Sequence, residues 1–207
     1  MLNALMQKTL PFRLAMCCLL LLGVHPLHAA EEPTACDSLA AHPEDPHRIA
    51  PGQSRAGIDL PVAITTCRRD VQTHPENGRL RYQLARVLFY SGQFDDAMEE
   101  MRLAAEGGHA QAQFVYGIFV IKKRPGAPTD ACVAARNWQA SAAGGRHAAS
   151  VHYAIQTLRG TFEQCEDPAP AKELTDWLNA AVRSAPVGYE GYYQRLFIED
   201  LQYRLAN

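Results

Sequence analysis

The chain has 207 residues and a formal net charge of −2 at pH 7, with 20 lysine or arginine and 22 aspartate or glutamate residues. Its only basic run is Lys122 to Arg124. Proteins that bind nucleic acid present clustered positive charge to the phosphates, so we expect no nucleic-acid partner.

Residues 1–30 have the order of a secretory signal peptide. Lys8 and Arg13 precede an apolar run from Leu14 to Val24, which HPLHAA follows, and cleavage is expected near Ala29 or Ala30. The run of about 11 residues is well short of the roughly 20 that span a bilayer as a helix. We therefore predict an exported protein, periplasmic or secreted, with no stable membrane insertion after cleavage.

Four cysteines remain after residue 30, at positions 36, 67, 132 and 165. An even set in an exported protein predicts two disulfides, for which three pairings are possible. The set contains no Cys-x-x-Cys, which disfavours a redox enzyme or a zinc knuckle.

Residues 31–58 are rich in Pro, His and Gly and lack a sustained apolar period. We predict an irregular N-terminal arm that covers the first helix. Within it, His42 and His47 flank an acidic pair in HPEDPH, a set that could ligate a metal. Their spacing on an irregular segment fixes no geometry, so we predict no metal site and no cofactor.

Capping residues and chain breakers predict helices through the rest of the chain. Asn77 and Asp130 are expected N-caps, and the pairs Gly107-Gly108 and Gly144-Gly145 are expected helix ends. The predicted ranges are 61–73, 78–90, 94–106, 110–122, 131–143, 147–158, 170–183 and 189–205.

An internal repeat underlies these helices. Shifting the chain by about 37 residues places AAEGGHAQAQFVYG, at 104–117, on SAAGGRHAASVHYA, at 141–154. Small residues recur at two sets of positions, where we expect helices to cross closely. They are Ala63, Ala97, Ala134 and Ala171 in one set, and Ala85, Gly117 and Ala154 in the other.

The stretch NGRLRYQLARVLFYSGQFDDAMEEMRLAA resembles a tetratricopeptide repeat, and the units that follow are similar to Sel1-like repeats. The resemblance covers roughly residues 60–184. It implies an all-α fold, a right-handed α-solenoid of stacked antiparallel helix pairs. We assign the repeats to 59–184 and a C-terminal capping helix to 185–207, with Tyr192, Leu196, Ile198, Leu201 and Leu205 near one side.

Stacking of this kind brings equivalent loops of neighbouring repeats together. It favours pairing Cys132 with Cys165, and the position of the arm over the first helix favours pairing Cys36 with Cys67. Sel1-like arrays of exported bacterial proteins are similarly stapled.

In tetratricopeptide-like arrays the first helix of each pair lines a concave groove, so the resemblance implies a partner-binding surface. Its aromatic and basic members are residue types that interfaces favour, and Arg86 is the strongest single candidate. The predicted partner-binding residues are Arg79, Tyr82, Arg86, Phe89, Tyr90, Phe114, Lys122 and Arg159, with Gln111, Ile118, Val151 and Ile155 at matching positions.

The sequence contains no Ser-x-x-Lys, Gly-x-Ser-x-Gly, His-Glu-x-x-His or Gly-rich phosphate-binding motif. We therefore predict no enzyme, but a non-catalytic module that binds a peptide or a protein. Two alternatives stay open: a cell-envelope hydrolase or metal-binding protein with an unrecognised site, and a structural or assembly factor.

Overall fold

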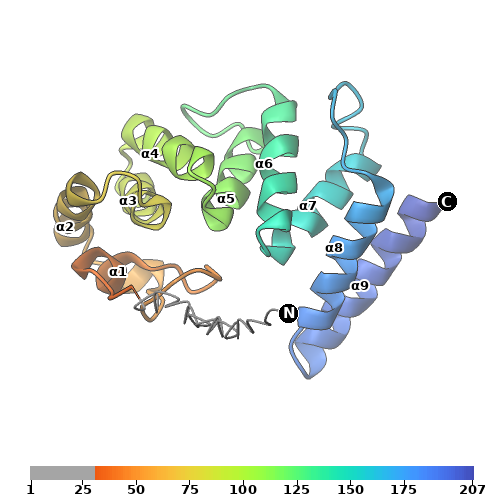
Figure 1. Cartoon of the computed structure of the whole chain (residues 1–207), viewed down its shortest axis with the longest axis horizontal. Coiled ribbons are helices and arrows are strands. Elements are labelled where there is room, and N and C mark those ends of the chain that lie inside the picture. Colours follow the sequence, from red (N-terminus) through yellow and green to blue (C-terminus); the bar gives the residue numbers. More distant parts are fainter. Residues whose placement is uncertain (1–30) are drawn as a thin grey trace, which may run out of the picture. The chain divides into compact units, whose positions relative to one another are not determined.

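The computed structural model describes residues 31–207, so the predicted signal peptide at 1–30 lies outside the described residues. The described residues form α-helices and one short 3-10 helix, η1 (Arg55–Gly57), with no strand among them (Figure 1). The α-helices are α1 (Ala35–Ala40), α2 (Leu60–Thr73), α3 (Gly78–Tyr90), α4 (Phe94–Glu106), α5 (Ala110–Ile121), α6 (Ala131–Ala143), α7 (His147–Leu158), α8 (Ala171–Ser184) and α9 (Tyr189–Ala206).

Helices α2 to α9 confirm the eight predicted helices, with ends that differ by one residue at most. Helix α1 was missed, because the arm at 31–58 was expected to be irregular. A signal for it exists in the sequence. The Thr34 hydroxyl accepts a hydrogen bond from the Asp37 amide, and the Asp37 carboxylate accepts one from the Thr34 amide. This reciprocal pair is a capping box.

The core of residues 31–207 is a series of interfaces between helices that follow one another along the chain. Each helix from α1 to α8 packs against the next, and α9 also contacts α7. The buried apolar residues form three clusters, one around α2 and α3, one around α3 to α5, and one from α5 to α9. The prediction of an all-α fold is confirmed.

Five helices, α3 to α7, end in the same turn. In each, an N–H beyond the helix donates to the carbonyl five residues earlier, and the residue before that N–H has a positive φ, as in a Schellman motif. The residues with positive φ are Gly92 (85°), Gly108 (82°), Lys123 (49°), Gly145 (84°) and Gly160 (73°). The turns at Gly108 and Gly145 lie 37 residues apart, so the duplicated sequence encodes a duplicated turn.

The small residues that predicted close helix crossings are buried, with one exception. Ala63, Ala85, Ala97, Ala134 and Ala154 are 0% exposed. At Gly117 of α5, an added Cβ would lie 2.3 Å from Nε1 of Trp138 on α6. The exception is Ala171, which is exposed at the first residue of α8 and so makes no crossing.

Helix α9 buries only part of the face that was expected to cap the repeats. Ile198 and Leu201 are buried, whereas Tyr192 and Leu196 are 51% and 43% exposed. Gly191 allows the entry to α9 to approach the Pro186 backbone, because an added Cβ would lie 1.6 Å from the Pro186 carbonyl oxygen. None of the helices in residues 31–207 has the length and apolar character needed to cross a membrane.

Both predicted disulfides are present. Cys36 on α1 pairs with Cys67 on α2, and Cys132 at the start of α6 pairs with Cys165 in the connection from α7 to α8. The Cα–Cα distances are 4.7 and 5.4 Å. Two disulfides indicate that the chain folds in an oxidising compartment.

We predict that Gly117→Ala destabilises the protein by about 1–3 kcal/mol, because the methyl group forces Trp138 out of a packed site. Alanine has a higher helix propensity than glycine, so propensity alone would make Gly117→Ala more stable than the wild type. Chemical denaturation measures the change. The control is Gly57→Ala, where an added Cβ has only ordinary contacts; equal stability of the two variants would contradict the close approach of α5 and α6.

Candidate functional site

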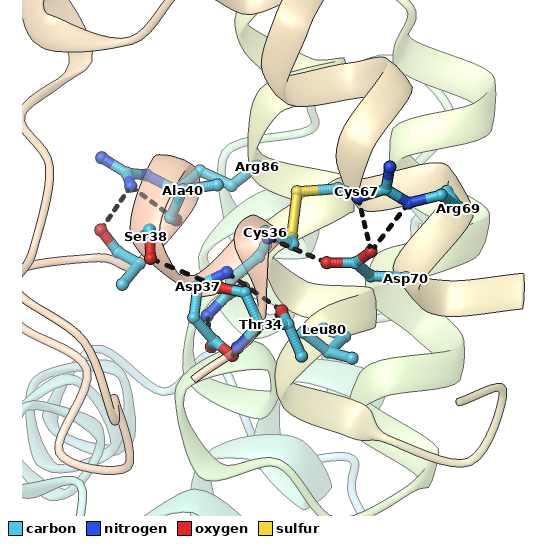
Figure 2. The surroundings of a disulfide bond; sticks show 12 residues. Thr34, Cys36, Asp37, Ser38, Ala40, Cys67, Arg69, Asp70, Leu80 and Arg86 are labelled. Atoms are coloured by element: carbon cyan, nitrogen blue, oxygen red, sulfur yellow. Dashed lines mark hydrogen bonds and ion pairs between the residues drawn. A yellow bond between two sulfur atoms is a disulfide. The ribbon is translucent and has the colours of Figure 1, made fainter. Parts of the chain in front are cut away.

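The arm, residues 31–58, lies on α2 and α3. Its helix α1 is bonded to α2. The Cys36–Cys67 disulfide is covalent, and beside it the Cys36 amide donates to the Asp70 carboxylate at 2.9 Å (Figure 2). Arg69 also donates to that carboxylate, at 3.3 Å. The start of α1 is therefore fixed to the last two turns of α2 by a covalent bond and a charge-assisted hydrogen bond.

A buried ion pair joins α1 to α3. The Arg79 guanidinium donates to the Asp37 carboxylate, and Gln83 donates to the same oxygen at 2.8 Å. Burial alone raises the pKa of the Asp37 carboxyl, but hydrogen bonds from Arg79, Gln83 and the Thr34 amide outweigh it, so that pKa is lowered. Arg79 also pairs with Glu31. This predicted binding residue thus serves to hold the arm.

Arg86 holds the end of α1 and the segment beyond it. One of its terminal nitrogens donates to the carbonyls of Ala40 and Ala41 at 2.9 Å each, and the other donates to the Gln53 carbonyl at 2.6 Å. The side chain is 5% exposed. Arg86 was expected to reach solvent or an acidic partner, and it does neither. It donates to backbone carbonyls of the arm, because a planar guanidinium carries several N–H donors in a fixed geometry.

Four of the predicted groove residues come together, but under the arm. Tyr82, Arg86, Phe89 and Tyr90 line a cavity of about 120 Å³ that His42 of the arm also lines. Arg55 and Arg86 stand over the Tyr90 ring, with guanidinium carbons 4.9 and 5.2 Å from its centre. Burial raises the pKa of Tyr82 above its ordinary value, and its hydroxyl accepts from Gln111.

The other three predicted residues lie apart from that cavity. Phe114 is half-buried, with the Arg146 guanidinium over its ring and His152 against its edge. Lys122 and Arg159 are exposed where α5 and α7 end. The structure therefore does not gather the eight predicted residues into one open surface.

An open groove of about 530 Å³ lies between α7, α8 and α9. Its apolar lining includes Val151, Phe197 and Ile198, and its charged lining consists of Glu44, Arg146 and Glu190. The remaining lining residues are His147, Ala148, His152, Ala181, Ser184, Pro186 and Gln194. A concave site with an apolar surface and a few convergent polar groups is typical of a binding site.

The two histidines of the groove are partly buried. Burial is the main cause that lowers the pKa of both His147 and His152, and the Arg146 charge lowers both further. Arg146 donates through Nε to Gln111 at 2.6 Å, which orients its guanidinium. Within residues 31–207 no hydrogen bond is found for its two terminal nitrogens.

The sequence predicted Val151 in a concave surface on the first helices of the repeats. In the structure Val151 lines a different groove, together with residues of α9 and the arm that were not predicted. The signal for α9 was present in the odd spacing of its apolar residues. Tyr192, Tyr193, Leu196 and Phe197 share one side of the helix, and Ile198 and Leu201 lie on another side. One helix cannot turn both sides to the core, and the first four residues are at least 43% exposed. Glu44 carries no comparable signal, because its place depends on the folding of the arm.

Comparison of the chain with models of known protein families, with curated proteins and with solved structures finds no match.

We predict that Arg86→Met destabilises the protein by at least about 2 kcal/mol, because buried carbonyls without a donor cost about 1–3 kcal/mol each. Denaturant unfolding measures the loss, and limited proteolysis of the arm gives a second measurement. The matched control is Arg68→Met, which removes an exposed pair with Asp96 and should change stability by less than about 0.5 kcal/mol. Similar losses in both variants would contradict the role of Arg86.

We also predict a dependence of stability on acid that involves Asp37. The pKa of Asp37 is lower in the folded protein than in the unfolded chain. Its ionised carboxylate therefore contributes fully to the free energy of unfolding above the unfolded pKa of about 3.9, and this contribution is lost as the pH falls through the folded pKa. Asp37→Asn cannot lose this contribution, so its unfolding free energy should fall less steeply than that of the wild type below about pH 5. Asp176→Asn, which removes an exposed carboxylate, is the control; an Asp37→Asn slope equal to the wild type's would refute the assignment.

Proposed function

We propose that this protein is an exported, non-catalytic module that binds a peptide or protein partner in the groove between α7, α8 and α9. We further propose that residues 59–184 are tetratricopeptide- or Sel1-like repeats, stacked as antiparallel helix pairs in a right-handed α-solenoid. Two disulfides support export, and the shared helix-ending turns and buried small residues support the repeats.

The observation that carries the binding function is the make-up of the groove. Its larger apolar side chains, Val151, Phe197 and Ile198, come from α7 and α9, and Arg146 also lines the groove. Phe197 is 49% exposed there, so a partner's apolar side chain can cover it. A groove that is already formed does not have to order itself on binding, which reduces the entropic cost of association.

The arm affects where on the chain a partner can bind. It covers the α3 face, where Arg79, Tyr82 and Arg86 are at most 6% exposed. The matching face of α7 is not covered in this way, and Val151 and His152 line the groove. We therefore propose a binding surface at α7, α8 and α9 in place of one that runs over α3, α5 and α7.

A second candidate is an assembly factor, which the outer surface of α9 favours. Tyr189, Tyr193 and Tyr203 are between 61% and 82% exposed. Exposed apolar side chains gathered on one element are typical of an interface. A self-association surface would include both Tyr203 and Phe197, whereas the groove includes only Phe197.

We predict that peptides selected from a displayed library by the disulfide-bonded chain will lose about 5- to 30-fold in affinity when the chain carries Phe197→Ala. Tyr203→Ala is the matched control, an exposed aromatic residue of the same helix outside the groove. Fluorescence anisotropy measures the affinities, and sedimentation velocity measures self-association. Selected peptides that bind Phe197→Ala as tightly as the wild type would reject the groove, and self-association lost in both variants would favour assembly.

A further inference from the structure

Two imidazoles and a carboxylate from distant parts of the chain meet at one point. Asp45 and His47 belong to the arm, and His109 is the N-cap residue of α5. One nitrogen or oxygen of each side chain lies within 4.8 Å of the other two. Asp45 Oδ2 and His109 Nε2 are 3.0 Å apart, although the two residues are 64 positions apart in sequence.

The fold holds two of these three groups in place. Asp45 is 0% exposed, and its second oxygen, Oδ1, accepts the His47 amide at 2.9 Å. Arg48 donates to the Asp45 carbonyl at 3.1 Å, which closes the same turn. His109 is 7% exposed, and its ring centre lies 5.3 Å from that of Tyr82. The carboxylate and one imidazole are thus set before any ligand arrives.

The third group provides access. His47 is exposed, and its ring centre lies 6.0 Å from that of His109. The other histidine of the motif, His42, accepts the Glu44 amide through Nδ1 at 3.0 Å and is not part of the cluster. The motif HPEDPH by itself fixes no geometry; His109, contributed by the turn between α4 and α5, completes a set of three.

We propose that Asp45, His47 and His109 form a binding site for one divalent transition-metal ion, with zinc as the ion that the donor set fits best. Two imidazole nitrogens and one carboxylate oxygen suit zinc, whereas calcium and magnesium take oxygen ligands almost entirely. Three protein ligands leave a coordination position for water.

The distances permit this with a small movement of one side chain. Ligand atoms about 2.0–2.1 Å from a tetrahedral zinc ion lie about 3.4 Å apart. Asp45 and His109 are already near that separation, so a metal takes the place of the hydrogen bond between them. The exposed His47 side chain closes the remaining gap, which is at most about 1.4 Å. A bound ion would tie the arm to the start of α5, at a point well separated in sequence from the Cys36–Cys67 disulfide.

The test uses the disulfide-bonded chain after treatment with a chelator and its removal. Titration calorimetry with zinc alone should show one ion per chain, and bound zinc should raise the melting temperature. Loss of a residue that only hydrogen-bonds to a metal ligand typically weakens metal binding about 10- to 100-fold. Because His47 is proposed as a ligand itself, His47→Ala should weaken zinc binding by at least about 100-fold. His109→Ala should do the same, and cobalt in place of zinc should give a visible spectrum that both variants lose.

His74→Ala is the control, because His74 is an exposed histidine at the end of α2, outside the cluster. It should bind zinc as the wild type does. If His109→Ala fails to fold, His47→Ala still tests the site, because the His47 side chain is exposed and its removal should leave the fold intact. Absence of zinc binding by the wild type, an unchanged affinity in His47→Ala, or an equal loss in His74→Ala would overturn the site.

Discussion

Residues 31–58 are held on α2 and α3 by one disulfide and by two buried arginines, and the candidate sites depend on that attachment. Arg79 supplies an ion pair to α1, and Arg86 supplies donors to three carbonyls of the arm. A segment rich in proline has few backbone partners of its own, and its buried carbonyls need donors from elsewhere. Because α3 provides them, the arm has a fixed course that places Glu44 in the groove and Asp45 beside His109.

Much of the fold could be predicted because local chemistry determines it. Glycines with positive φ end four of the five helices from α3 to α7, and Lys123 takes the same conformation at the fifth. Asn77 and Asp130 cap α3 and α6 through their side chains, as expected. These signals act within a few residues of one another, so they can be read from the sequence directly. The disulfide pairing was predicted from the expected stacking of repeats and from the expected position of the arm.

The binding surface could not be predicted in the same way, because it depends on contacts between distant segments. Arg86 looks like a groove residue on α3 alone, since nothing nearby in sequence neutralises it. The three carbonyls that it binds lie 33 to 46 residues earlier in the chain. Similarly, Phe197 looks like a residue of a capping helix, and only the packing of α9 beside α7 shows that it lines a groove. The predicted repeat makes positions on α3 and α7 equivalent, but the arm covers those on α3 and leaves those on α7 open.

The groove and the cluster of Asp45, His47 and His109 share one short piece of chain. Glu44 lines the groove, and the next residue, Asp45, carries the buried carboxylate of the cluster. The groove and the cluster are mechanically connected through this turn. The His47 amide and the Arg48 side chain both donate to Asp45, and these hydrogen bonds stiffen the turn that carries Glu44 and Asp45. An ion that ties this turn to His109 also fixes the position of Glu44 at the groove's edge. Coupling between two binding sites is reciprocal, so a partner that contacts Glu44 would change zinc affinity by the same factor as zinc changes the partner's affinity.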